Sequence, residues 1–144
     1  MNIVIYTGKY QYDVVNLFIS NVIYFLQKKQ FNVTVIDLEE SDHMNQIIEI
    51  FSTQNIYCVI SFNGIGVDIK QLDNGQYLYD LVNTIFLSIY VDHPSYHMGR
   101  LSENIKNYLC CFNDKEHVEY VNELLPNHHE IAFFLPHGGL TNNM

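Results

Sequence analysis

Short apolar runs alternate along the chain with longer segments in which apolar residues recur at helical spacing. Six runs are apolar almost throughout, which is typical of strands that are covered on both faces. These predicted strands are Asn2–Thr7, Phe31–Asp37, Ile56–Phe62, Phe86–Val91, Tyr108–Phe112 and Glu130–Leu135. Runs of this length, bounded by Gly, Asn, Asp and Pro, favour strands over buried helices.

The segments between these runs predict helices. Their apolar residues follow the i, i+3, i+4 rule, and several begin at a residue that can cap a helix. The predicted helices run from Asp13 to about Lys29, from a cap at Ser41 or Asp42 through Phe51, over Tyr77–Thr84, and from a capping box of Asn113 and Glu116 to Pro126.

Strands that alternate with helices are the signature of βαβ units. We therefore predict one α/β domain over residues 1–144, a Rossmann-like, doubly wound, mostly parallel six-stranded sheet with helices on both faces. The expected strand order is 3-2-1-4-5-6. In such sheets ligands bind at the carboxyl ends of the strands, here next to the first and fourth strands.

Composition limits the classes of partner. The chain has 7 basic and 16 acidic residues and a formal net charge of -9. This charge disfavours nucleic acid, which requires a basic face, and anionic membrane surfaces. No signal peptide is visible, and the most apolar predicted helix is too polar to span a bilayer, so a cytoplasmic location is expected.

The three cysteines predict neither a disulfide framework nor a structural zinc site. Cys58 and Cys111 fall within predicted strands, where a free thiol acts as a small hydrophobic side chain. Cys110 and Cys111 are adjacent, which is not a zinc-ligand spacing. The pattern fits a reducing compartment.

Polar residues follow each predicted strand, at the edge where open α/β sheets bind ligands. They are Gly8, Asp37, Asn63–Gly64, Asp92–His93, Asn113–Asp114 and His137–Gly138. Loops are polar in any protein, so position alone is weak evidence. The residue types, His, Asp and Gly, are more informative.

The densest polar cluster is Asp92-His93-Pro94-Ser95-Tyr96-His97. His93 is a candidate general base because imidazole titrates near neutral pH, and Asp92 is a candidate to orient that ring or to act as the base. The alternative is that Asp92 caps a turn and His93 is a loop residue. His93 and His97 have a metal-ligand spacing only on a helix, which Pro94 disfavours, so no metal is expected.

Two glycine-containing turns are further candidates for substrate binding. Asn63-Gly64-Ile65-Gly66 would let backbone N–H groups approach a ligand, or it is a simple tight turn. The same alternatives apply to His137-Gly138. The loop after the first strand, which begins at Gly8, lacks both a dinucleotide fingerprint and a phosphate-binding loop.

Four segments in this order, ISFNGIG, YVDHPSYH, CFNDKEHVEYV and FFLPHGG, resemble the N-terminal domain of bacterial GT-B glycosyltransferases similar to the CgeB spore-maturation family. The resemblance covers residues 59–139. It implies an acceptor-side domain in which Asp92 and His93 line the cleft, with Asn63, Gly64 and His137 around them. We therefore predict that Asp92 and His93 are catalytic and that Gly8, Asn63, Gly64, His97, His137 and Gly138 contribute to substrate binding.

The resemblance also implies what the domain works with. The partners would be an acceptor glycan or another hydroxyl-bearing substrate and a C-terminal domain that binds a nucleotide-sugar donor. That second domain is not in this sequence, so the chain alone is expected to be inactive. The alternatives are a stand-alone Rossmann-like binding or interaction domain without catalysis and a flavodoxin-like mononucleotide binder, against which the missing phosphate loop counts.

Overall fold

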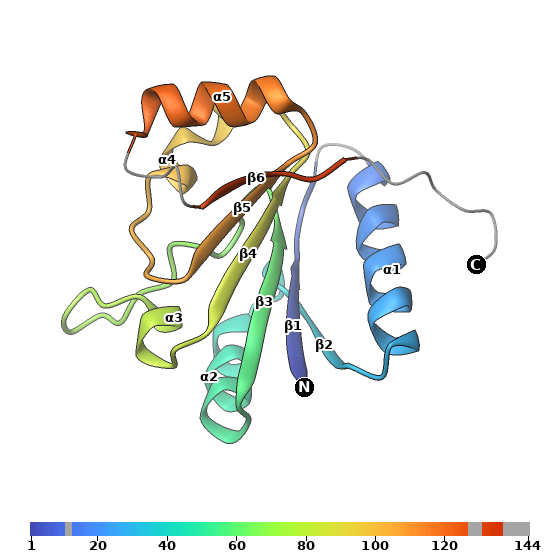
Figure 1. Cartoon of the computed structure of the whole chain (residues 1–144). Helices are drawn as coiled ribbons and strands as arrows, with labels where there is room; N and C mark the ends of the chain where they lie inside the picture. Colours follow the sequence, from blue (N-terminus) through green and yellow to red (C-terminus); the bar gives the residue numbers. More distant parts are fainter. Residues whose placement is uncertain (11–12, 127–130, 137–144) are drawn as a thin grey trace.

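A computed structural model describes residues 1–10, 13–126 and 131–136. Within these residues the chain forms one sheet of six parallel strands flanked by helices (Figure 1). The strands are β1 (Asn2–Thr7), β2 (Asn32–Asp37), β3 (Ile56–Phe62), β4 (Ile85–Tyr90), β5 (Tyr108–Phe112) and β6 (Ala132–Phe134). The predicted α/β fold class is confirmed, and every predicted strand is present.

The four predicted helices are present, and two further short helices lie between β4 and β5. They are α1 (Asp13–Lys28), α2 (His43–Thr53), α3 (Leu78–Leu81), α4 (Met98–Leu101) and α5 (Lys115–Leu124), with a short 3₁₀ helix η1 (Pro94–His97). No helix in the described part of the chain is both long enough and apolar enough to cross a bilayer.

The predicted strand order is wrong. The observed order is β2-β1-β3-β4-β5-β6, because β3 pairs with β1 and leaves β2 at the edge. The strand sequences suit this arrangement. Strand β2 (NVTVID) is more polar than β3 and is largely accessible, whereas five of the last six positions of β3 are buried. Successive strands are therefore added first on one side of β1 and then on the other, so the strand order reverses between β1 and β3. The expected ligand site moves to that point.

The two faces of the sheet are covered unequally. Right-handed crossovers place α1 on one face and the remaining helices on the other, as Figure 1 shows. Under α1, a small core gathers around Ile5, Ile19 and Ile60. On the opposite face a larger core includes Ile47, Phe86 and other residues from every strand.

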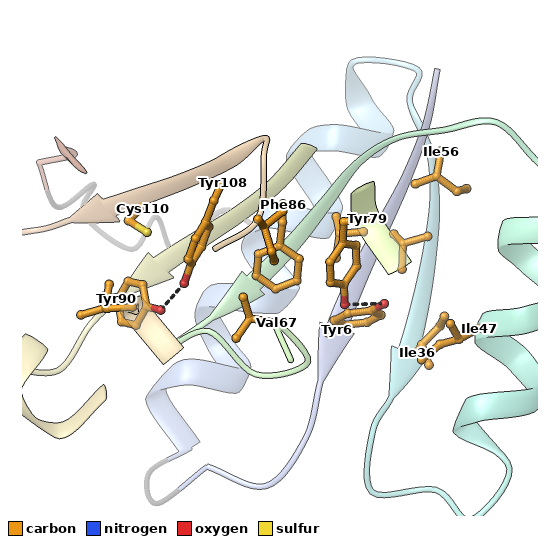
Figure 2. Close-up of a cluster of buried hydrophobic side chains, with 14 of the residues drawn as sticks. Tyr6, Ile36, Ile47, Ile56, Val67, Tyr79, Phe86, Tyr90, Tyr108 and Cys110 are labelled. Atoms are coloured by element: carbon orange, nitrogen blue, oxygen red, sulfur yellow. Dashed lines mark hydrogen bonds between the residues drawn. The ribbon is translucent and has the colours of Figure 1, made fainter. Parts of the chain in front are cut away.

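Four fully buried tyrosines are central to the larger core (Figure 2). Tyr90 and Tyr108 share a hydrogen bond of 2.6 Å between their hydroxyls, and the hydroxyls of Tyr79 and Tyr6 share one of 3.2 Å. Tyr79 also donates to the carbonyl of Gly66, just beyond β3. Pairing satisfies hydroxyls that would otherwise be costly to bury. The pairs also connect the core to the loops at the carboxyl end of the sheet.

Three local predictions need correction. The cap of α5 is Asp114, whose Oδ1 accepts from the N–H of Glu116 at 2.8 Å, rather than a box of Asn113 and Glu116. Asp42 occupies the N-cap position of α2 without a side-chain capping bond. Pro94 was expected to disfavour a helix across His93 and His97, and His93 does lie outside the helix as its N-cap; a short 3₁₀ helix begins at Pro94 itself, because a proline at the first helical position gives up no hydrogen bond.

Candidate functional site

The candidate site lies at the carboxyl edge of the sheet, where β3 and β4 pass into loops. Parallel strands bring the residues after their ends together at one edge, so Asn63 and Asp92 become neighbours although they are 29 positions apart. The site is built from the loop after β3, the loop after β4, and the helices η1 and α4 that follow.

The loop after β3 has a tightly constrained backbone. Asn63, Gly64 and Gly66 have positive φ angles of 52°, 71° and 79°. A Cβ on Gly64 would meet the Tyr90 hydroxyl and lie 3.1 Å from the Cβ of Arg100, and a Cβ on Gly66 would lie 2.7 Å from the Tyr6 ring. The space beside both glycines is thus filled by the protein itself, which supports the tight-turn interpretation of this segment.

Asn63 connects this loop to the segment after β4. The side chain is buried, and its Oδ1 accepts from the N–H of Val91 at 3.0 Å. Its Nδ2 donates to Asp92 Oδ2 at 3.0 Å, and its backbone carbonyl accepts from the Arg100 guanidinium at 2.9 Å. One asparagine therefore positions both a carboxylate and a guanidinium at the edge of the sheet.

Asp92 and His97 form the second half of this network. The His97 Nε2 lies 3.3 Å from Asp92 Oδ2, the same oxygen that accepts from Asn63. Burial lowers the pKa of His97; the Asp92 hydrogen bond opposes this shift and the charge of Arg100 adds to it. The lowered pKa favours the neutral ring, which can donate to Asp92 when its proton is on Nε2.

The Asp92 carboxylate remains accessible. Its side chain is 50% exposed, compared with 15% for His97. Both hydrogen bonds within the described structure reach Oδ2, and none reaches Oδ1. Asp92 thus presents one oriented, accessible oxygen that can accept a hydrogen bond or a proton from an incoming group.

His93 is turned away from this network. Its Nδ1 accepts from the N–H of Ser95 at 3.2 Å and lies 2.8 Å from the Ser95 hydroxyl, so His93 caps η1. Its ring packs edge-to-face against His117 and Tyr120 of α5, at centroid distances of 4.8 and 4.9 Å. The structure thus brings Asp92 together with His97 and not with His93.

Two further residues at this edge were not identified from the sequence. Arg100, the only arginine in the chain, lies on the four-residue helix α4, which has no periodic signal. Tyr10 follows β1, and its hydroxyl is buried without a hydrogen-bond partner among the described residues. The pKa of Tyr10 is raised, mainly by burial. The negative charge of Asp37 adds to this shift, and the positive charge of Arg100 opposes it. The Tyr10 hydroxyl therefore lies within electrostatic range of both charges, in the loop after β1.

The remaining predicted residues fall into two groups. A Cβ on Gly8 would lie 3.4 Å from the Ile65 side chain, so the loop after β1 touches the loop after β3. His137 and Gly138 lie outside the described residues.

Among the residues that the structure describes, no cluster of three His, Cys, Asp or Glu side chains is placed to hold a metal ion.

Comparisons of the chain with protein-family models, curated proteins and solved structures gave no match. The residues of the site are therefore the basis for assigning a function. Its chemistry is that of an oriented carboxylate beside an imidazole whose pKa is lowered, with a guanidinium nearby and a buried hydroxyl that has no partner among the described residues.

Proposed function

We propose that this domain is the acceptor side of a glycosyltransferase and that Asp92 receives the acceptor hydroxyl. The supporting observation is the Asp92 carboxylate, which is half exposed and is held through one oxygen by Asn63 and His97. The resemblance of four segments to GT-B glycosyltransferases, with Asp92 and His97 both in the second, agrees with this assignment.

In the proposed reaction, the hydroxyl oxygen of the acceptor attacks the anomeric carbon of the donor sugar. Asp92 Oδ1 accepts the proton of this hydroxyl at the same time. The bond between this carbon and the nucleotide phosphate breaks, and the nucleotide leaves with the electron pair. His97, through its Nε2–H, fixes the carboxylate and is a positioning residue. The donor would be bound by a second domain, so this chain alone is expected to bind the acceptor without transferring sugar.

A saccharide titration followed by NMR tests the proposal. We expect a panel of mono- and disaccharides to include members that shift the amide signals of residues at the carboxyl edge. Asp92→Asn should weaken this binding about tenfold or more, because hydrogen bonds to charged groups contribute roughly 1.5–3 kcal/mol. Asp73→Asn, in the exposed loop before α3, is the matched control and should bind normally.

The proposal fails if no saccharide perturbs this edge of the sheet. It also fails if Asp92→Asn and Asp73→Asn bind the same saccharide equally well. A thermal melt of both variants separates loss of binding from loss of folding, and Asp92 is exposed enough that its substitution is expected to preserve the fold.

A stand-alone binding domain is the second candidate, and one observation favours it. The buried hydroxyl of Tyr10 has no hydrogen-bond partner among the described residues and lies within electrostatic range of Arg100, in the loop after β1, and sheets of this strand order bind ligands such as mononucleotides between β1 and β3. A phosphate-bearing ligand would supply the acceptor that this hydroxyl lacks and the anion that Arg100 favours.

Tyr10→Phe distinguishes this candidate. Removing a buried hydroxyl that has no partner should leave the melting temperature of the free protein unchanged or slightly higher. If AMP binds at this point, it should raise the melting temperature of the wild type, and Tyr10→Phe should lose most of that increase. An AMP effect that is equal in both proteins, or absent from both, would remove this candidate.

A further inference from the structure

Most of the Arg100 guanidinium forms no hydrogen bond within the described part of the chain. Its Nη1 donates to the backbone carbonyl of Asn63 at 2.9 Å, and no carboxylate among the described residues lies within ion-pair distance of it. A guanidinium carries five N–H donors in a rigid fork. Lys70, in contrast, pairs with Glu103 at 3.3 Å. Arg100 therefore differs from a basic side chain that only joins two parts of the fold.

The backbone and the base of the side chain of Arg100 are held in place. The Tyr108 hydroxyl donates to the Arg100 carbonyl at 3.2 Å, and the Arg100 Cβ lies 3.1 Å from the position that a Cβ on Gly64 would take. Arg100 is nevertheless an exposed residue. A cation that is both anchored and accessible is preorganised for binding, because little side-chain freedom remains to be lost.

The guanidinium belongs to the candidate site at the carboxyl edge of the sheet. Asn63 accepts from Arg100 through its backbone carbonyl and donates to Asp92 through its side chain. Burial is the main cause of the pKa shifts of His97 and Tyr10, and the charge of Arg100 contributes to both shifts. Arg100 therefore lies within electrostatic range of both side chains.

The Tyr10 hydroxyl is a second donor near this cation. It is buried and has no partner among the described residues. Burial raises its pKa, so the hydroxyl keeps its proton at neutral pH and can donate it in a hydrogen bond. Buried polar side chains nearly always have a partner, so this hydroxyl is a reason to expect a ligand atom. Lys9, the preceding residue, is exposed and adds a positive charge to the same loop.

Together these groups favour an anionic group on the ligand. A neutral hydroxyl could accept from Tyr10, but it would leave the charge of Arg100 uncompensated. A carboxylate or phosphate group can do both, and its oxygens match the guanidinium fork in pairs. The Asp92 carboxylate, which Asn63 also holds, repels such a group. An acidic ligand is therefore oriented with a hydroxyl toward Asp92 and its anionic group toward Arg100.

We propose that Arg100 and Tyr10 form an anion subsite, and that the acceptor in the proposed transfer reaction is an acidic saccharide. The saccharide part of this inference rests on the proposed glycosyltransferase function. The subsite itself rests on the contacts of Arg100 and Tyr10. Glucuronate and glucose 6-phosphate represent the two sources of negative charge, a carboxylate and a phosphate.

NMR titration of the full chain tests the proposal. Because the chain has one arginine, the side-chain Nε–H signal of Arg100 is unambiguous. The probes are glucose, glucuronate and glucose 6-phosphate, which differ only at C6, and inorganic phosphate. We expect an acidic sugar to shift this signal and to bind about tenfold more tightly than glucose, as hydrogen bonds to a charged group imply. Added salt should reduce this preference, because it screens accessible charges.

Variants assign the preference to the subsite. Arg100→Gln should lose most of the preference for the acidic sugar over glucose, and Arg100→Lys should keep part of it, because lysine retains the charge without the fork. Lys29→Gln is the matched control. It removes the same charge from an exposed residue just beyond the end of α1, and it should keep the preference. Should Arg100→Gln fail to fold, the shift of the Arg100 signal in the wild type remains the measurement.

Two results would overturn the anion subsite. One is an Arg100 signal that neither the acidic sugars nor inorganic phosphate shift. The other is a preference that Arg100→Gln and Lys29→Gln reduce equally, which would reflect only the net charge of the chain.

Failure of the subsite and failure of the proposed function give different results. If glucose binds as tightly as both acidic sugars and Asp92→Asn weakens all three, the glycosyltransferase function stands and the acidic acceptor is wrong. If inorganic phosphate shifts the Arg100 signal but no saccharide binds, the subsite stands and the glycosyltransferase function is wrong.

Discussion

Gly64 lies where two side chains close around the backbone of the loop after β3. Its φ of 71° and the nearness of a Cβ to Tyr90 and Arg100 make this position doubly restrictive. Gly75 has a similar φ of 69° but no atom within 4 Å of its Cβ position. The two glycines therefore separate the cost of backbone conformation from the cost of overpacking.

We predict that Gly75→Ala lowers the free energy of unfolding by about 1 kcal/mol, the cost of a left-handed backbone for alanine. Gly64→Ala should cost roughly 1–3 kcal/mol more, because the buried loop must also accommodate the methyl group. Urea unfolding of both variants measures the difference. Equal costs would show that Tyr90 and Arg100 move aside freely.

His97 gives the site a defined pH dependence. Its pKa is lowered mainly by burial, so at mildly acidic pH the unfolded chain binds a proton that the folded site resists. Stability should therefore fall as the pH decreases through the ordinary histidine pKa of about 6.5, and the loss should level off below the lowered pKa of the folded protein.

We expect His97→Gln to make the free energy of unfolding less dependent on pH in this range. His43→Gln, on α2, is the control that should keep the contribution of His97. Urea unfolding at a series of pH values from 5 to 8 measures the slopes. Parallel slopes for the wild type and His97→Gln would mean that the folded site does not hold this ring neutral.

At the scale of elements, local patterns were sufficient for the strands but not for their order. Apolar runs such as Ile56–Phe62 predicted each strand, because a strand that is buried on both faces has apolar residues at nearly every position. The pairing of β3 with β1 depends on a choice between two neighbours, and periodicity does not encode that choice. The polar residues Asn32 and Thr34 of β2 were the available sign that β2 is the edge strand.

The site was predictable to a similar extent. Parallel strands necessarily bring Asn63 and Asp92 to one edge, so their meeting follows from the fold class. The choice of His97 over His93 as the partner of Asp92 could not be predicted, because it depends on η1, a helix of one turn that begins at Pro94. Arg100 was missed for the same reason, since its helix α4 has only four residues.

At the scale of the whole molecule, the unequal cover of the two faces should be visible in the reactivity of the three free cysteines. Adjacent Cys110 and Cys111 point to opposite faces of β5: Cys110 is buried in the larger core, and Cys111 is half buried on the other face. Cys58 is buried in β3, on the side of the sheet that α1 covers. Burial raises the pKa of Cys58 to about 11 and that of Cys110 to about 12, and it also raises the pKa of Cys111.

We predict that N-ethylmaleimide at pH 8 modifies Cys111 first, and that Cys58 and Cys110 react only as the protein opens. A raised pKa reduces the reactive thiolate of all three thiols, so access decides their order. Peptide mass spectrometry over time measures each rate, and added urea should accelerate Cys58 and Cys110 far more than Cys111. If Cys111 is instead as protected as Cys110, the side of β5 that carries Cys111 is covered as completely as the larger core.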